Sequence, residues 1–199
     1  MSRFLCLTVI AICGLAVVAC SSDSGSPTAT ETPKSFTVEG EGMAPTLRNG
    51  DQVPVEPYSE SLPQRGDIIV FRSPTAVHRD FAKRVIGLPG DAIRIDDSAG
   101  KVFVNGAALA EDYARGLTHC YSQCNFTVPE RTGAASLGDG GAMARAQFAD
   151  PAEEEAACRQ RGCYFVLGDN RQNSSDSRFG WLVPAENIIG RVTSNRSAQ

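Results

Sequence analysis

The chain has 199 residues, of which 42% are hydrophobic and 21% charged, with 19 Lys and Arg against 23 Asp and Glu. This is the composition of an ordinary folded protein, and the length suits one medium domain or two very small ones. A net charge of −4 without a cluster of Lys and Arg in the sequence excludes nucleic acid as an expected partner. Only one apolar run in the sequence approaches membrane-span length, which excludes a protein with several membrane spans.

The first twenty residues are typical of a secretory signal. One cation, Arg3, precedes an uncharged apolar stretch from Phe4 to Ala19. The residues that end it, Val17-Val18-Ala19-Cys20, resemble a bacterial lipobox, which predicts a signal peptide over residues 1–19 and a lipid on Cys20. The alternative is an uncleaved transmembrane helix, which the shortness of the run, about 16 apolar residues, disfavours.

Residues 20–35 contain too few apolar side chains to offset the entropy of ordering them. We expect a disordered tether there, followed by a domain over residues 36–195 that the lipid on Cys20 holds at a membrane. These expectations place the protein in a bacterial cell envelope, facing the periplasm or the exterior.

Short β-branched segments separated by Gly, Pro and Asp make up much of the domain. They predict strands over Asp51–Val55, Asp67–Phe71, Ala82–Leu88, Ala92–Asp96, Lys101–Val104, Tyr164–Leu167 and Ile188–Thr193. The fourth and fifth predict a hairpin, because Ile93 and Ile95 alternate with polar residues before a DDSAG turn and Val102 and Val104 flank Phe103 after it. The sequence thus predicts a mainly β fold in which the early and late strands form one sheet system.

Residues 113–163 differ in character and indicate an inserted subdomain of helix and loop. Asp150 as N-cap, Pro151 at the first helical position and Gly162 at the end predict one helix.

Four cysteines remain for the folded domain once Cys6 and Cys13 leave with the signal and Cys20 carries lipid. They are Cys120, Cys124, Cys158 and Cys163. An even number of cysteines in an exported chain favours disulfides, whose pairing the sequence leaves open. The spacings, with His119 beside the first pair, also permit a zinc site.

Three stretches are dense in chemically active residues: GMAPTL from Gly42, KRVIGLPGD from Lys83 and GDNRQNSSDSR from Gly168. The third requires either a mutually satisfied polar network or a solvated loop with Asx turns. Lys83 begins an apolar run, where desolvation disfavours the ammonium and lets the amine act as a general base. The alternative is that Lys83 and Arg84 are surface charges at a strand end.

Together and in this order, the three stretches resemble the bacterial type I signal peptidase family of Ser/Lys serine endopeptidases. The resemblance covers most of residues 36–195. It implies a β-sheet peptidase fold that needs neither cofactor nor metal, and exported proteins or signal peptides in extended conformation as partners.

The resemblance also implies a role for individual residues. Lys83 matches the general base, and Ser174 matches the hydroxyl that orients its amine. Other positions match the surrounding ionic network and the substrate cleft: Arg84, Asp169, Asp176 and Arg178 for the network, and Met43 and Pro45 for the cleft.

Position 42 departs from the family pattern. The family's nucleophilic serine immediately precedes the methionine, and here that place holds Gly42, which has no oxygen to attack with. Gly40 stands where many members have a serine that helps to hold the oxyanion, so the Gly42 N–H is the remaining candidate donor. Thr46 matches a threonine that is not a nucleophile, and Ser174 is expected on the far side of the amine.

The sequence therefore predicts a catalytically impaired, signal-peptidase-like lipoprotein that retains a cleft for extended peptides. An active signal peptidase and a structural lipoprotein without peptide affinity are the alternatives.

Overall fold

The computed structural model describes residues 34–59, 61–74, 79–122, 124–133 and 151–193. The predicted signal peptide, Cys20, the tether up to residue 33 and the helix cap Asp150 lie outside these ranges. Within them, nothing helical reaches the length and hydropathy of a membrane span.

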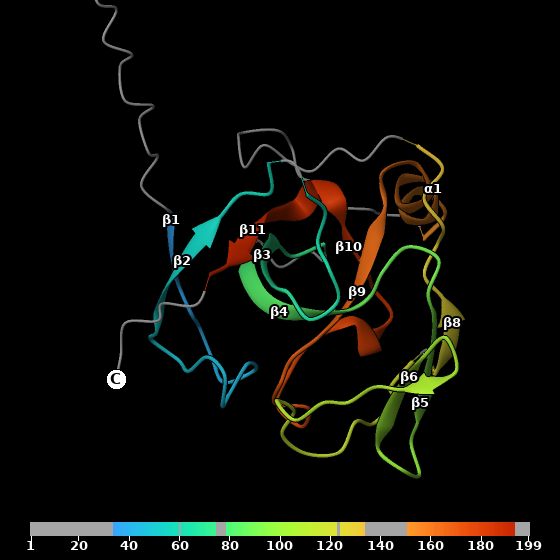
Figure 1. Ribbon diagram of the computed structural model, residues 1–199, viewed down its shortest axis with the longest axis horizontal. Coiled ribbons are helices and arrows are strands. Elements are labelled where there is room, and N and C mark those ends of the chain that lie inside the picture. Colours follow the sequence, from blue (N-terminus) through green and yellow to red (C-terminus); the bar gives the residue numbers. More distant parts are fainter. Residues whose placement is uncertain (1–33, 60, 75–78, 123, 134–150, 194–199) are drawn as a thin grey trace, which may run out of the picture. The chain divides into compact units, whose positions relative to one another are not determined.

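Seven antiparallel strands form the larger sheet, in the order β1-β2-β11-β3-β4-β9-β10 (Figure 1). Their bounds are β1 Lys34–Thr37, β2 Gln52–Glu56, β3 Ile68–Arg72, β4 Asp80–Gly87, β9 Cys163–Leu167, β10 Val183–Pro184 and β11 Ile188–Val192. Since β11 lies between β2 and β3, and β9 beside β4, early and late segments share one sheet, as the sequence predicts.

A second, four-stranded antiparallel sheet has the order β7-β6-β5-β8. Its strands are β5 Ala92–Asp96, β6 Lys101–Val104, β7 Ala107–Ala108 and β8 Asn125–Thr127. The predicted hairpin is confirmed, with Ile93 opposite Val104 and Ile95 opposite Val102. It forms a sheet of its own with β8, instead of extending the larger sheet, because its apolar face is buried against β4 and β9.

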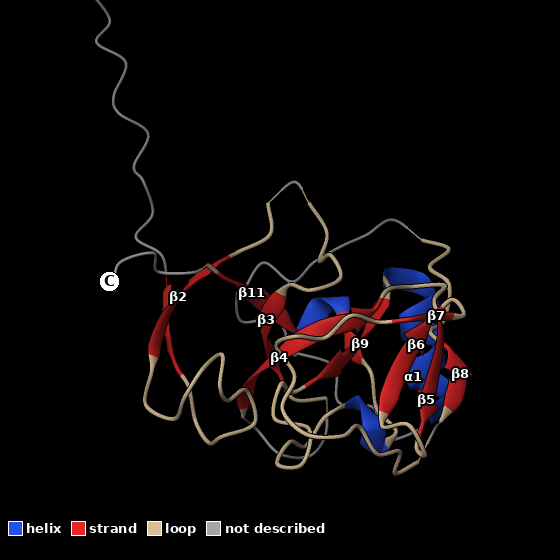
Figure 2. Ribbon diagram, turned by 60° about the horizontal axis from the view of Figure 1, so that its bottom comes forward, coloured by secondary structure: helices blue, strands red, loops and turns tan. Residues whose placement is uncertain are grey.

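Strands β4 and β9 belong to the larger sheet, and one face of each packs against the smaller sheet (Figure 2). All five residues of β9 are buried. Tyr164 and Val166 pack into a core cluster with β3 and β11, whereas Phe165 and Leu167 pack into another with the hairpin. A strand covered on both faces has a continuous apolar sequence, and this explains the run CYFVL.

The strands that the sequence did not predict are short. β7 and β10 have two residues each and β8 has three. Strand β1 begins at Lys34, inside the last two residues of the segment expected to be tether, and pairs with β2 at the edge of the sheet. Segments this short have no detectable period, so their strand conformation comes from the neighbour they pair with.

The predicted helix is α1, Pro151–Arg161. Gly162 follows with a φ of 97°, a left-handed conformation that favours glycine, and its N–H bonds to the Cys158 carbonyl, which ends the helix. The helix contacts β10 and the 3₁₀ helix η2, Ala185–Asn187. A second 3₁₀ helix, η1, spans Ser177–Phe179.

All four cysteines of the domain form disulfides, Cys120–Cys124 and Cys158–Cys163. The structure thereby decides the pairing that the sequence left open. Cysteines in a disulfide offer no thiolate to a metal, so they do not form the alternative zinc site.

We expect loss of the Cys158–Cys163 bridge to destabilise the domain more than loss of Cys120–Cys124. Both bridges close short loops, worth about 2 kcal/mol each in the chain-entropy account. Cys158 and Cys163 are fully buried, so replacing them by alanine removes about 1 kcal/mol more for each lost sulfur. Urea unfolding of the two Cys→Ala double variants measures the difference, and equal losses would contradict this ranking.

Candidate active site

Lys83 lies inside strand β4, with only 6% of the residue exposed. Its Nζ donates a hydrogen bond to the Ala82 carbonyl, 3.0 Å away. Burial lowers the pKa of the amine from 10.5 to about 8. The negative charges of Asp176 and Asp169 oppose this shift and raise the pKa, but the effect of burial is larger. Lys83 is therefore a buried amine that can be neutral near physiological pH, not a surface charge.

Core packing and hydrogen bonds both hold the turn that carries Gly42. Met43 and Leu47 pack into a core cluster with residues of β2, β3 and β4. The Asn170 N–H donates to the Gly42 carbonyl, and the Asn170 side-chain amide donates to the Glu41 carbonyl, both at 3.1 Å. The turn thus has a defined position against the loop that follows β9.

Polar atoms from two other segments converge on Gly42. A Cβ placed on this glycine would lie 3.3 Å from Lys83 Nζ, 3.5 Å from the Asn173 carbonyl oxygen and 3.6 Å from Ser174 Oγ. The structure thus brings Gly42, Lys83 and Ser174 close together. The orienting contact that the resemblance implies is absent from the described residues, because Lys83 Nζ bonds to the Ala82 carbonyl and Ser174 Oγ has no hydrogen-bond partner there.

The carboxylate of Asp169 connects the same three segments. It accepts two hydrogen bonds from Arg84 of β4, at 2.8 and 2.6 Å, and a third from the Thr46 hydroxyl. Asp169 is fully buried, and a bidentate, charge-assisted pair is the strongest contact such a carboxylate can make. Arg84 therefore has a structural role beside Lys83.

A second buried ion pair fixes the loop that carries Ser174. Arg178 donates to both oxygens of Asp176, at 2.8 and 2.9 Å, and both residues are fully buried. Asp176 also accepts from the Gly168 N–H at 3.0 Å, which holds the loop on the end of β9. A Cβ on Gly168 would overlap Ser174 Oγ and the Gly42 carbonyl, so only glycine allows this close approach.

Two residues of this loop have roles that the sequence analysis missed. Asn170 holds the Gly42 turn, as described above. Arg171 is 1% exposed and bonds to Glu111, to the Thr118 hydroxyl and, at 3.0 Å, to the Gly168 carbonyl. Both residues belong to the third motif, but apart from the Gly168 carbonyl their partners lie far away along the chain.

The structure places the two predicted cleft residues differently from each other. Met43 is 2% exposed and belongs to the core beneath the turn. Pro45 is exposed and follows a cis peptide bond with Ala44. Their contact with a peptide stays a prediction.

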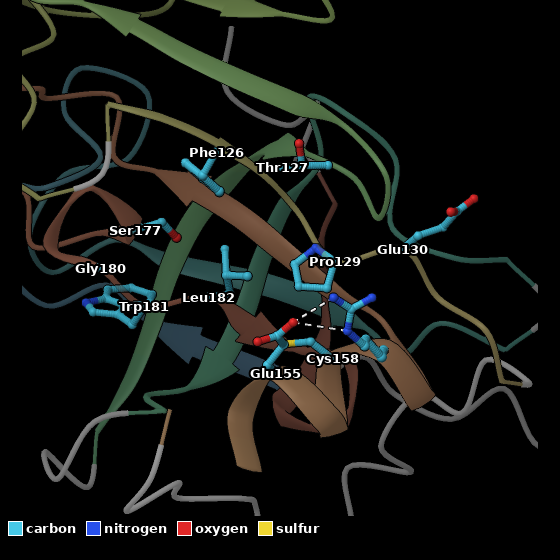
Figure 3. A pocket seen from close by; sticks show the side chains of 11 residues that line it. Phe126, Thr127, Pro129, Glu130, Glu155, Cys158, Ser177, Gly180, Trp181 and Leu182 are labelled. Carbon is cyan, nitrogen blue, oxygen red and sulfur yellow. Dashed lines mark hydrogen bonds and ion pairs between the residues drawn. The ribbon is translucent and has the colours of Figure 1, made fainter. Parts of the chain in front are cut away.

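A pocket of about 520 Å³ lies apart from these residues (Figure 3). It is lined by one side of α1, by the end of β8 and by the segment after η1, including Cys158, Phe126 and Trp181. Glu155 and Arg159 form an ion pair at its edge. Its lining includes neither Lys83 nor Ser174, so it is not the site of the predicted chemistry.

Comparison with known proteins identifies the family of this chain. The family model for signal peptidase, peptidase S26, matches residues 4–195. The chain belongs to this family. Its catalytic members are serine endopeptidases, and the resemblance of the three motifs is thereby confirmed at the level of the family.

Individual signal peptidases are about one third identical to this chain within the aligned residues. Signal peptidase I of Pseudomonas fluorescens is 32% identical over 79% of this chain, and signal peptidase IB of Staphylococcus aureus is 30% identical over 79%. The matches cover 62% and 74% of those two proteins. A crystal structure of a signal peptidase I from Enterococcus faecalis V583 is 33% identical and covers 68% of this chain and 100% of that one, with a TM-score of 0.42.

We expect the stability of the domain to depend on pH through Lys83. Between pH 8 and 10.5 the unfolded chain binds a proton that the folded chain does not, so stability rises with pH there. Below pH 8 the folded chain bears the full cost of a buried ammonium, on the order of 3 kcal/mol. Lys83→Met should therefore be more stable than the wild type at pH 7, with an advantage that shrinks towards pH 10.

Urea unfolding at a series of pH values measures this difference. Lys101→Met, which changes an exposed lysine of β6, is the matched control and should differ little from the wild type throughout. An advantage of Lys83→Met that does not change with pH would contradict the buried, titrating amine.

Proposed function

We propose that this chain is a signal-peptidase-like protein of the bacterial cell envelope that binds extended exported peptides and lacks the serine route of cleavage. The observation that carries the proposal is the position of Gly42: its absent side chain would point at the amine of Lys83, 3.3 Å from the Cβ position. In the family pattern, that is where the attacking serine stands. Lys83, which matches the general base of the family pattern, would then face a residue without a hydroxyl.

A glycine at this position removes the covalent mechanism. A Ser/Lys peptidase needs an alcohol oxygen that attacks the scissile carbonyl while the amine accepts its proton. Loss of the nucleophile from a serine protease lowers turnover on the order of 10⁶-fold, and what remains comes from binding and oxyanion contacts.

Peptide binding does not depend on that oxygen. An extended peptide can pair with strand edges through main-chain hydrogen bonds while small side chains fill shallow pockets. The relatives named signal peptidase I support signal peptides of exported proteins as the ligand class. A lipid on Cys20 would hold the domain at the membrane from which such peptides emerge.

An active signal peptidase is the second candidate, and the Lys83 site favours it. A buried amine with a pKa near 8 destabilises the fold at neutral pH, and a protein that only binds peptides has no use for it. A nucleophile from another residue or from a partner would complete such a site.

We expect Gly42→Ser to convert the chain into an efficient peptidase. The new hydroxyl would lie next to Lys83 Nζ, which is 3.3 Å from the Cβ position and, as the flexible end of a long side chain, can shift by the few tenths of an ångström that a Cβ requires. Cleavage of an Ala-x-Ala peptide, followed by mass spectrometry, should rise on the order of 10⁶-fold over the wild type and disappear in Gly42→Ser/Lys83→Met.

Binding is measured separately, by fluorescence anisotropy of a labelled Ala-x-Ala peptide. The wild type and Gly42→Ala should bind it equally well. A wild type without affinity would favour a structural lipoprotein, and rapid cleavage by the wild type would favour the active signal peptidase.

A further inference from the structure

Three polar atoms surround the position that a side chain at residue 42 would occupy. The Lys83 amine, the Ser174 hydroxyl and the Asn173 carbonyl all lie 3.3 to 3.6 Å from the Cβ position. The neutral amine and the hydroxyl can each donate or accept a hydrogen bond, and the carbonyl accepts one. Together they can hold a molecule that both donates and accepts hydrogen bonds.

Ser174 has a buried hydroxyl that lacks a partner among the residues the structure describes. A buried polar atom left without a hydrogen bond costs about 1–3 kcal/mol, so native proteins satisfy nearly all of them. The hydroxyl borders the space above Gly42. A CH₂OH group occupies about the 30 Å³ that one water molecule fills, and a water needs two to four polar partners.

We propose that a water molecule bound over Gly42 by Lys83 and Ser174 replaces the missing serine, and that the chain hydrolyses bound peptides directly, without an acyl-enzyme. This inference rests on the proposed binding of extended peptides at the same site. It adds a slow peptidase activity to a chain that lacks a nucleophilic side chain.

The reaction balances with water as the only co-reactant. The water oxygen forms a bond to the scissile carbonyl carbon, the neutral amine of Lys83 accepts one water proton, and the carbonyl π electrons move to its oxygen. When the C–N bond breaks, the Lys83 ammonium returns the proton to the leaving nitrogen. The products are a carboxylic acid and an amine.

The electrostatic surroundings of Lys83 suit this role. Asp169 and Asp176 face it from the loop after β9, and each is already paired with an arginine, Arg84 and Arg178. Burial therefore dominates, and with a pKa near 8 roughly one tenth of the amines are neutral at pH 7. The rate should rise about tenfold per pH unit below pH 8 and level off above it.

Gly42→Ala is the decisive variant. Its methyl group takes the place of the water and supplies no oxygen, and the backbone of Gly42 is not in the left-handed region, so alanine is compatible with the fold. We expect Gly42→Ala and Lys83→Met each to lower the slow hydrolysis about 100-fold or more, to the uncatalysed rate. Lys101→Met, on the second sheet, should cleave at the wild-type rate with the wild-type pH profile.

The assay incubates the purified full-length chain with an Ala-x-Ala peptide for hours at pH 6 to 9 and identifies products by mass spectrometry. Wild-type hydrolysis that survives in Gly42→Ala or Lys83→Met would overturn the water mechanism. Intact-mass measurement with an activated ester tests for a covalent intermediate: Gly42→Ser should be acylated and the wild type should not. An acyl group on Ser174 of the wild type would also overturn it.

Binding separates this inference from the function on which it rests. A wild type that binds the peptide at pH 6 and does not cleave it above the rate of Lys83→Met at any pH leaves the proposed binding intact and refutes the bound water as nucleophile. A wild type with no affinity for the peptide refutes both.

Discussion

The buried carboxylate of Asp169 is the contact on which the site depends. Its hydrogen bonds to Arg84 and Thr46 connect the end of β9 to β4 and to the Gly42 turn, three segments that are far apart in the sequence. A buried carboxylate without partners is too costly to persist, so it is stable only when all three segments are in place. The geometry around Lys83 is therefore coupled to the folding of the sheet.

The second constraint is steric. Gly168 lets the end of β9 approach both Ser174 and the Gly42 carbonyl, and Asp176 holds the loop there through the Gly168 N–H. Among the described residues of this network, Ser174 has the one buried hydroxyl without a hydrogen-bond partner, and it lies 3.6 Å from the position of a Cβ on Gly42. The buried amine of Lys83 costs stability at neutral pH, so a site without chemical use would become more stable by losing it. Its retention is the physical reason to look for a nucleophile other than a side chain.

The two-sheet arrangement explains why Lys83 and the loop that carries Ser174 have rigid supports. β4 and β9 are covered on one face by the first core cluster and on the other by the hairpin sheet, which makes them rigid supports. Lys83 comes from one of them and the Ser174 loop follows the other. The disulfide Cys158–Cys163 fixes the opposite end of β9 to α1, so the strand that positions the loop is held at both ends.

Local sequence determined the longer strands, the hairpin with its bounds and the helix with its glycine end. The alternation of apolar and polar residues, the turn residues and the capping residues act within a few positions, so they can be recognised without knowledge of the fold. Only the tertiary structure decided that the hairpin pairs with β8, which cysteines join, and that Asn170 and Arg171 hold the site. Each of these depends on partners that are brought close by packing of distant segments, and no local period or spacing encodes such partners.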